Sequence, residues 1–103
     1  MANLTKVATT QEIKPGDAKQ VILGGKKIAL FNVGGTFYAI DDACPHKGGS
    51  LSEGTFDDTT VTCPWHGAEF DMTTGKALSA PAVKGVGSYK VVVTGDDIQL
   101  ELP

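Results

Sequence analysis

The sequence predicts an all-β fold of small antiparallel sheets, and three observations support this. Short runs rich in β-branched and aromatic residues recur along the 103 residues, with turn residues between them. The chain has 13 glycines, which suits a domain with many tight turns. Two loops concentrate Cys, His, Pro and Gly, as in β scaffolds that carry their chemistry on loops. We therefore expect one domain over residues 1–103.

The elements follow in order along the chain. A single helical turn is expected near Thr10–Ile13, where a threonine can cap it and a Pro-Gly pair ends it. A half-buried strand over Lys27–Val33 should turn at Gly34-Gly35 into the next strand, because paired glycines favour a tight hairpin. The other expected strands are residues 21–23, 36–40, 59–63, 69–72, 88–94 and 98–102, the last two joined by a Gly-Asp-Asp turn.

Composition limits the class of partner. The net charge is only −3 and all nine basic residues are Lys, which argues against nucleic acid or an anionic membrane as partner.

The N-terminus has no apolar signal segment, and the longest apolar runs are far too short to span a bilayer. We expect a soluble, cytoplasmic monomer. Because cytoplasmic thiols stay reduced, the two cysteines are better explained as ligands or catalysts than as a disulfide.

The chain's two cysteines and two histidines all lie in the loops 43–51 and 63–70. They occur as Cys44-Pro45-His46 and Cys63-Pro64-Trp65-His66. A soft thiolate and a borderline imidazole nitrogen together favour a transition metal. The candidate ligands are Cys44, His46, Cys63 and His66.

Several interpretations of this pattern are open. A Cys44–Cys63 disulfide would leave both histidines unused, and a Cys–His catalytic dyad would need only one of the two pairs. Two histidines with purely structural roles are a further possibility. A tetrahedral Cys2His2 zinc site is the main rival, although zinc sites usually group Cys with Cys and His with His. Here each loop supplies one of each, which fits two metals, one bound by both cysteines and one by both histidines.

This double pattern, C-x-H followed by C-x-x-H, resembles the Rieske [2Fe–2S] family. Its supporting residues match as well, and they are Gly48-Gly49, Gly67, Phe70-Asp71 and Thr74-Gly75. The resemblance implies one [2Fe–2S] cluster in a cluster-binding portion at about 43–83. It assigns Cys44 and Cys63 to the inner iron, and His46 and His66 to the outer iron.

The strongest resemblance is to the ferredoxin components of bacterial aromatic-ring-hydroxylating dioxygenases. It implies a one-electron carrier, not an enzyme, that takes electrons from an NAD(P)H-dependent flavin reductase and passes them to a terminal oxygenase. Docking would be transient, near His46 and His66. An alternative is a small Rieske subunit fixed in a larger reductase such as nitrite reductase, and a zinc-stabilised interaction module is a third possibility.

Residues around the ligands should tune the cluster. High-potential Rieske proteins carry a Ser and a Tyr hydroxyl near the cluster, and here Ala68 and Phe70 take those positions. We therefore expect a reduction potential near the low end of the Rieske range, about −150 mV. Pro81 belongs either to a third loop that covers the cluster or to an ordinary turn. The full set expected around the ligands is Pro45, Lys47, Gly48, Pro64, Trp65, Gly67, Ala68, Phe70 and Pro81.

Overall fold

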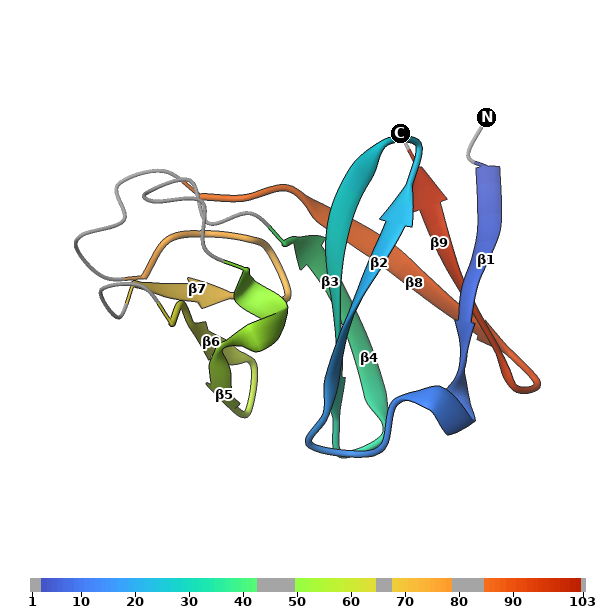
Figure 1. Ribbon diagram of the computed structural model, residues 1–103, viewed down its shortest axis with the longest axis horizontal. Helices are drawn as coiled ribbons and strands as arrows, with labels where there is room; N and C mark the ends of the chain where they lie inside the picture. The colour runs from blue at the N-terminus through green and yellow to red at the C-terminus, as the bar shows by residue number, and fades with distance from the viewer. Residues whose placement is uncertain (1–2, 43–49, 65–67, 79–84, 103) are drawn as a thin grey trace.

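The computed structural model describes residues 3–42, 50–64, 68–78 and 85–102 (Figure 1). A six-stranded antiparallel sheet has the order β1-β9-β8-β4-β3-β2, and a three-stranded sheet has the order β5-β6-β7. The all-β prediction is confirmed. The strands are β1 Asn3–Thr9, β2 Ala18–Leu23, β3 Lys26–Val33, β4 Thr36–Asp41, β5 Thr55–Asp57, β6 Thr60–Thr62, β7 Glu69–Asp71, β8 Ser88–Thr94 and β9 Asp97–Leu102; the 3-10 turns are η1 Thr10–Glu12 and η2 Leu51–Glu53.

The glycine pairs make the tight turns that the sequence predicts. Strands β3 and β4 pair up to Val33 and Thr36, which leaves only Gly34 and Gly35 in the turn. Both glycines have positive φ, +60° and +97°, a conformation that L side chains rarely adopt. The hairpin expected at this point is therefore confirmed, as is the helical turn expected near Thr10–Ile13, which is seen as η1.

The larger sheet curves around a core to which most of its strands contribute. Its buried side chains come from β1, β2, β3, β4 and β9, together with Ile13 of the segment after η1. Each strand alternates its side chains between two faces, so every second residue reaches this core. The core residues are Ala8, Ile13, Val21, Ile28, Leu30, Ala39, Ile98 and Leu100.

Strand β3 is buried on both faces, which corrects the prediction of a half-buried strand. Ile28 and Leu30 face the first core, whereas Ala29 and Phe31 face a second core under the three-stranded sheet. The Phe31 and Phe56 rings meet edge to face with centroids 5.2 Å apart. The sequence could not predict this second layer, because the strand that brings Phe56 is only three residues long.

The three-stranded sheet is an insertion in the larger one. Strands β4 and β8 are hydrogen-bonded neighbours, with Ala39 opposite Tyr89, although β5, β6 and β7 lie between them in sequence. The insertion packs to one side of the larger sheet (Figure 1). Strands β1 and β5 were not among the expected strands.

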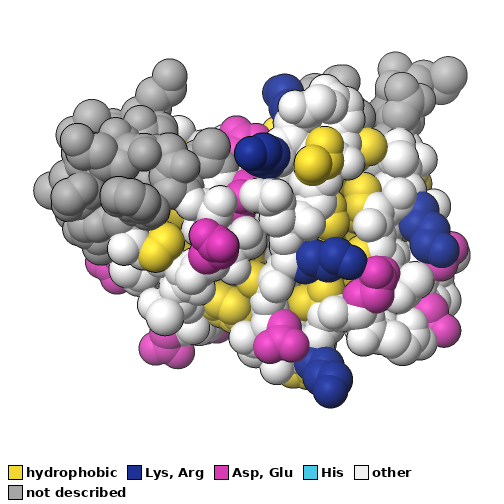
Figure 2. Space-filling view, in the orientation of Figure 1, with side chains coloured by type: hydrophobic (Ala, Val, Ile, Leu, Met, Phe, Trp, Pro, Cys, Tyr) yellow, Lys and Arg dark blue, Asp and Glu magenta, His cyan; other side chains and the backbone are white. Residues whose placement is uncertain are grey.

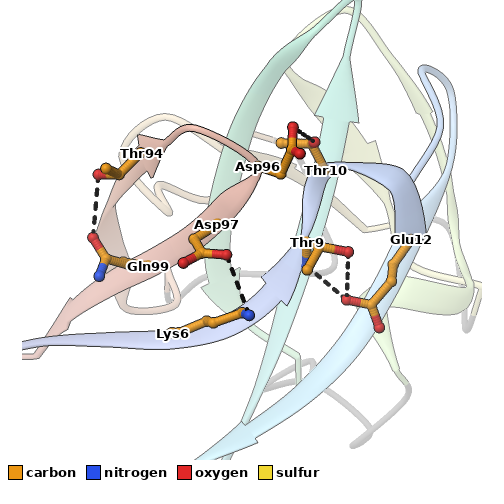
Figure 3. Close-up of polar contacts among 8 residues, drawn as sticks. All are labelled: Lys6, Thr9, Thr10, Glu12, Thr94, Asp96, Asp97 and Gln99. Atoms are coloured by element: carbon orange, nitrogen blue, oxygen red, sulfur yellow. Dashed lines mark hydrogen bonds and ion pairs between the residues drawn. The ribbon is translucent and has the colours of Figure 1, made fainter.

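Polar contacts tie β1 and η1 to the rest of the larger sheet on the side away from the insertion (Figures 1 and 3). Lys6 Nζ lies 3.2 Å from Asp97 Oδ1, and the Thr10 N–H donates to the Asp96 carbonyl oxygen at 2.8 Å. In the described ranges, no helix has the length and apolar character needed to cross a membrane.

Candidate metal centre

Cys63 stands at the base of its loop in a fixed position. It follows β6 directly, and its N–H donates to the Ala68 carbonyl oxygen at 2.7 Å, which extends the β6–β7 ladder by one bond. Only residues 64–67 therefore lie between the two ends of the loop. Cys63 is 1% exposed and packs in the second core beside Ala68 and Phe70. A thiolate here would be shielded from water, which suits a metal ligand better than an exposed nucleophile.

The other cysteine-bearing loop, residues 43–49, is also fixed at both ends. Before it, Asp42 follows β4 and donates its N–H to the Lys27 carbonyl oxygen at 3.0 Å. After it, the Leu51 N–H donates to the Asp42 carbonyl oxygen at 2.7 Å. Leu51 is fully buried in the same core as Cys63. The described ends of both loops therefore rest on one core.

A third segment, residues 79–84, begins and ends beside this core. Before it, the Leu78 N–H donates to the Glu69 carbonyl oxygen at 2.8 Å. After it, the Val86 N–H donates to the Gly75 carbonyl oxygen at 2.7 Å. A Cβ on Gly75 would lie 2.0 Å from the Val86 carbonyl oxygen, so only glycine allows this approach. Pro81, expected either in a covering loop or in an ordinary turn, lies between these two attachments in sequence.

The sequence-predicted site residues divide into two groups. Cys63, Pro64, Ala68 and Phe70 lie in the described part of the chain. Within that part, no group of three or more His, Cys, Asp and Glu side chains could hold a metal. The predictions that lie outside the described residues are Cys44, Pro45, His46, Lys47, Gly48, Trp65, His66, Gly67 and Pro81.

The described wall beside Cys63 is apolar. Ala68 and Phe70 are fully buried, and neither carries a hydroxyl group. A cluster held at Cys63 would therefore gain no hydroxyl hydrogen bond from these two positions. Low polarity around a cluster disfavours added negative charge, which agrees with the low potential expected from the sequence.

A close contact behind Cys63 is not predictable from the sequence. Gly54 ends η2, and a Cβ there would lie 2.1 Å from the Thr62 carbonyl oxygen and 3.2 Å from Pro64 Cδ. Because residue 54 is a glycine, the end of η2, which follows the first loop, can pack directly on β6, the strand that precedes Cys63. Nothing in the local sequence predicts it, because Gly54 has an ordinary φ of −78°.

Two consecutive carboxylates just before the first loop, Asp41 and Asp42, were also not predicted as part of the site. Asp42 is 1% exposed, and Asp41 accepts a hydrogen bond from the Tyr89 hydroxyl at 2.5 Å. Burial and the nearby Asp41 raise the pKa of Tyr89 to about 12. Burial acts to raise the pKa of Asp42, but hydrogen bonds from Ser52 and Gln20 outweigh it and lower that pKa. The sequence signal that could have indicated these residues is an Asp-Asp pair directly before a ligand motif.

The described part of the insertion has a mainly acidic surface. Its described side chains include only one Lys, Lys76, against five acidic residues. Figure 2 shows acidic side chains without Lys over the described part of the insertion on that face, whereas both signs mix over the larger sheet. The acidic residues are Glu53, Asp57, Asp58, Glu69 and Asp71.

The described residues fit a [2Fe–2S] cluster. One cysteine of the donor set lies buried at the base of a short loop, and the neighbouring loop that carries the other Cys–His pair is anchored on the same core. Two thiolates and two imidazoles are the donor set of a Rieske cluster. The set does not suit a disulfide or a single nucleophile, either of which would leave donors unused.

Comparisons with known proteins agree on one family. The model of the Rieske [2Fe–2S] domain matches residues 3–90. The 3-phenylpropionate/cinnamic acid dioxygenase ferredoxin subunit of Escherichia coli K12 is 56% identical over 77 residues, which are 74% of this chain and 73% of that protein.

Solved structures give the same result. The ferredoxin of carbazole 1,9a-dioxygenase from Nocardioides aromaticivorans IC177 has a TM-score of 0.90 at 32% identity, covering 95% of this chain and 96% of its own. A ferredoxin in complex with the oxygenase of carbazole 1,9a-dioxygenase has a TM-score of 0.85 at 33% identity, with 94% and 91% covered. A structure assigned to an NADH-dependent nitrite reductase small subunit from Mycobacterium tuberculosis has a TM-score of 0.90 at 26% identity, with 100% and 97% covered.

Proposed function

The chain belongs to the Rieske [2Fe–2S] domain family, and we propose that it is the ferredoxin of a multicomponent dioxygenase. The protein is an electron carrier with one [2Fe–2S] cluster and is not itself an enzyme. In the proposed role it takes single electrons from an NAD(P)H-dependent flavin reductase and gives them to a terminal oxygenase. The 56% identity to a dioxygenase ferredoxin subunit supports this role above the others.

The proposed ligands are Cys44, His46, Cys63 and His66. The observation that carries this assignment is that the chain's only two cysteines are each followed by one of its only two histidines. Cys63 supports it, because this residue is buried at the base of its loop. When bound, the cluster supplies a site that accepts and releases one electron. Ala68, Phe70 and Leu51 share a buried core with Cys63 and would keep water from its thiolate.

Docking to both partners is proposed to be transient and to use the surface near His46 and His66. The structure of a ferredoxin bound to its oxygenase supports an oxygenase as one partner. The acidic side chains of the described part of the insertion would favour a partner with a basic docking face, and the attraction would weaken with salt. We place this exchange in the cytoplasm, with the chain as a monomer between encounters.

The experiment is reconstitution with known partners. The purified protein should be red-brown and should give a rhombic EPR signal with a low average g value on reduction. It should then support NADH-dependent turnover of 3-phenylpropionate with the reductase and oxygenase of the Escherichia coli system. His66→Ala should lose iron and all turnover, whereas Asp97→Asn, far from the insertion, should retain both. Stoichiometric zinc in colourless protein would refute the assignment.

A second candidate function is a small Rieske subunit of a larger reductase. The nitrite reductase small subunit has the same fold over the whole chain, so the fold alone does not separate the two functions. Co-purification with a large subunit from the source cell, together with no electron transfer to the oxygenase, would favour this candidate.

A further inference from the structure

Two consecutive carboxylates lie at the point where the chain leaves the larger sheet for the proposed ligand loop. Asp41 is the last residue of β4, Asp42 follows it, and Cys44 is two residues further on. Neighbouring residues of an extended chain point to opposite sides. The two carboxylates therefore contact different parts of the molecule: Asp42 contacts η2, which follows the ligand loop, and Asp41 contacts residues 87–89, where the chain returns to the larger sheet.

Asp42 joins the two ends of the first loop. Its main chain bonds to Lys27 before the loop and to Leu51 after it, at 3.0 and 2.7 Å. Its side chain repeats the connection, because Oδ1 accepts from the Ser52 N–H at 2.8 Å and Oδ2 accepts from the Gln20 side-chain amide. The carboxylate thus links β2 of the larger sheet to η2, which follows the loop.

Asp41 holds the segment by which the chain returns to the larger sheet. Its Oδ2 accepts from the Gly87 N–H at 2.9 Å, and its Oδ1 accepts from the Tyr89 hydroxyl at 2.5 Å. The Asp41 N–H also donates to the Gly87 carbonyl oxygen at 2.9 Å. A Cβ on Gly87 would lie 2.9 Å from Asp41 Oδ2, so a larger residue there would push the carboxylate away.

These carboxylates are unusual in having only neutral partners. Within the described part of the chain, no ion pair includes Asp41 or Asp42. Burying a carboxylate without a cation, as at Asp42, costs free energy unless several donors compensate for the lost water. Asp42 accepts from Gln20 on β2 and from Ser52 in η2, which are two different segments, whereas the two donors to Asp41, Gly87 and Tyr89, belong to one segment. An Asn at position 42 keeps only one of the two carboxylate oxygens and could hold only one of its two segments, and an Asn at position 41 could hold only one of its two donors.

We propose that Asp41 and Asp42 are positioning residues for the cluster, with Asp42 fixing both ends of the 43–49 loop and Asp41 fixing residues 87–89. The proposal rests on the ligand assignment above, since it concerns a loop said to carry Cys44 and His46. The carboxylates would act through the main chain of the ligand loops and would not touch the iron.

The test compares Asp42→Asn, Asp42→Ala and Asp41→Asn with Asp97→Asn, which removes the same charge from an exposed ion pair with Lys6. The cluster should be lost to a strong iron chelator at least tenfold faster in the three variants, and within twofold of the parent rate in the control. The residual cluster should show shifted or broadened EPR g values, which a general loss of stability would not produce.

Two milder variants keep the proposal testable if a carboxylate variant does not fold. Gln20→Ala and Tyr89→Phe each remove one donor and leave both carboxylates in place. Each should speed cluster loss by a smaller factor, about threefold, and combining them should multiply the effects. Parent rates and unchanged g values in all folded variants would overturn the proposal. Failure of the ligand assignment is distinguishable, because the parent protein would then contain no [2Fe–2S] signal before any variant is made.

Discussion

The larger sheet is built from strands of six to eight residues, whereas each strand of the three-stranded sheet has three. Long strands give the larger sheet its own enclosed core. The short strands bury Val61 and Phe70 only by sharing a core with Ala29, Phe31 and Ile40 of the larger sheet. The larger sheet can therefore be stable through its own core, whereas the insertion depends on packing against the larger sheet.

This difference shows where the cofactor matters for folding. A three-residue strand offers few ladder bonds, and small sheets rarely hold without further packing. The insertion has few ladder hydrogen bonds. It gains close backbone contacts instead, at Gly54, Gly75 and Gly85, where a Cβ would not fit. We expect a cluster that ties two of its loops together to add the remaining stability.

Removing the metal should give the largest effect. Chelation of iron should raise the hydrogen exchange of the β6 and β7 amides by about 100-fold or more, since opening of the insertion then costs less free energy. Exchange in β3 and β9 should change by less than about threefold. Hydrogen exchange with mass spectrometry measures both regions in one sample. Equal loss of protection in the two sheets would show that they unfold as one unit.

Gly54→Ala should produce the next largest effect. The new methyl group would meet the Thr62 carbonyl oxygen, and overpacking of this kind costs about 3 kcal/mol in the free energy of unfolding. Gly34→Ala in the larger sheet is the matched control, because that glycine has φ +60° and nothing near its missing Cβ. It should cost only about 1 kcal/mol. Urea unfolding measures both, and equal costs would contradict a steric role for Gly54.

The apolar wall beside Cys63 predicts a change in redox behaviour. The double variant Ala68→Ser, Phe70→Tyr adds two hydroxyl donors, which stabilise the reduced form more than the oxidised form. The reduction potential should rise by about 60 mV, the equivalent of a tenfold shift for one electron. Val91→Thr adds a hydroxyl in the larger sheet and should leave the potential unchanged. An EPR-monitored redox titration that finds no rise would refute this account of the wall.

The smallest expected effect is a pH dependence confined to the larger sheet. Hydrogen bonds from Lys19 and Thr9 lower the pKa of Glu12 from 4.5 to about 2. Because the folded pKa lies below the unfolded value, this stabilisation is present above pH 4.5 and is lost as the pH falls towards 2. Glu12→Gln should lower the melting temperature slightly at pH 7 and converge with the parent near pH 2. Since Glu12 is exposed, salt should reduce the difference, while the cluster EPR signal stays the same.

The sequence predicted the larger sheet well where local chemistry decides the structure. Gly34 and Gly35 carry their turn preference wherever they occur, and the alternation in 88–94 is long enough to define a strand. Strand β1 was missed because its residues, Asn3–Thr9, have only weak alternation and no turn signal before them. The ends of the strands otherwise differ from expectation by at most three residues.

The candidate metal ligands follow from a local sequence pattern, whereas the residues that support them do not. Cys63 and His66 lie only three residues apart, so their spacing alone indicates a pair of metal ligands. The contacts of Gly54 with Thr62 and of Asp42 with Gln20 join residues far apart in sequence, so no local pattern contains them. The assignments of Cys44, His46 and His66 stay predictions, since these residues lie outside the described ranges.

The chain leaves the larger sheet at Asp41 and returns to it at Gly87, and the main chains of these residues are hydrogen-bonded to each other. An inserted segment whose two ends meet can lengthen, shorten or change its surface without moving its host. The sequence and length of the insertion can therefore diverge in evolution while the larger sheet keeps its strand order. The same geometry offers protein engineers one fixed junction at which a different redox module could be grafted.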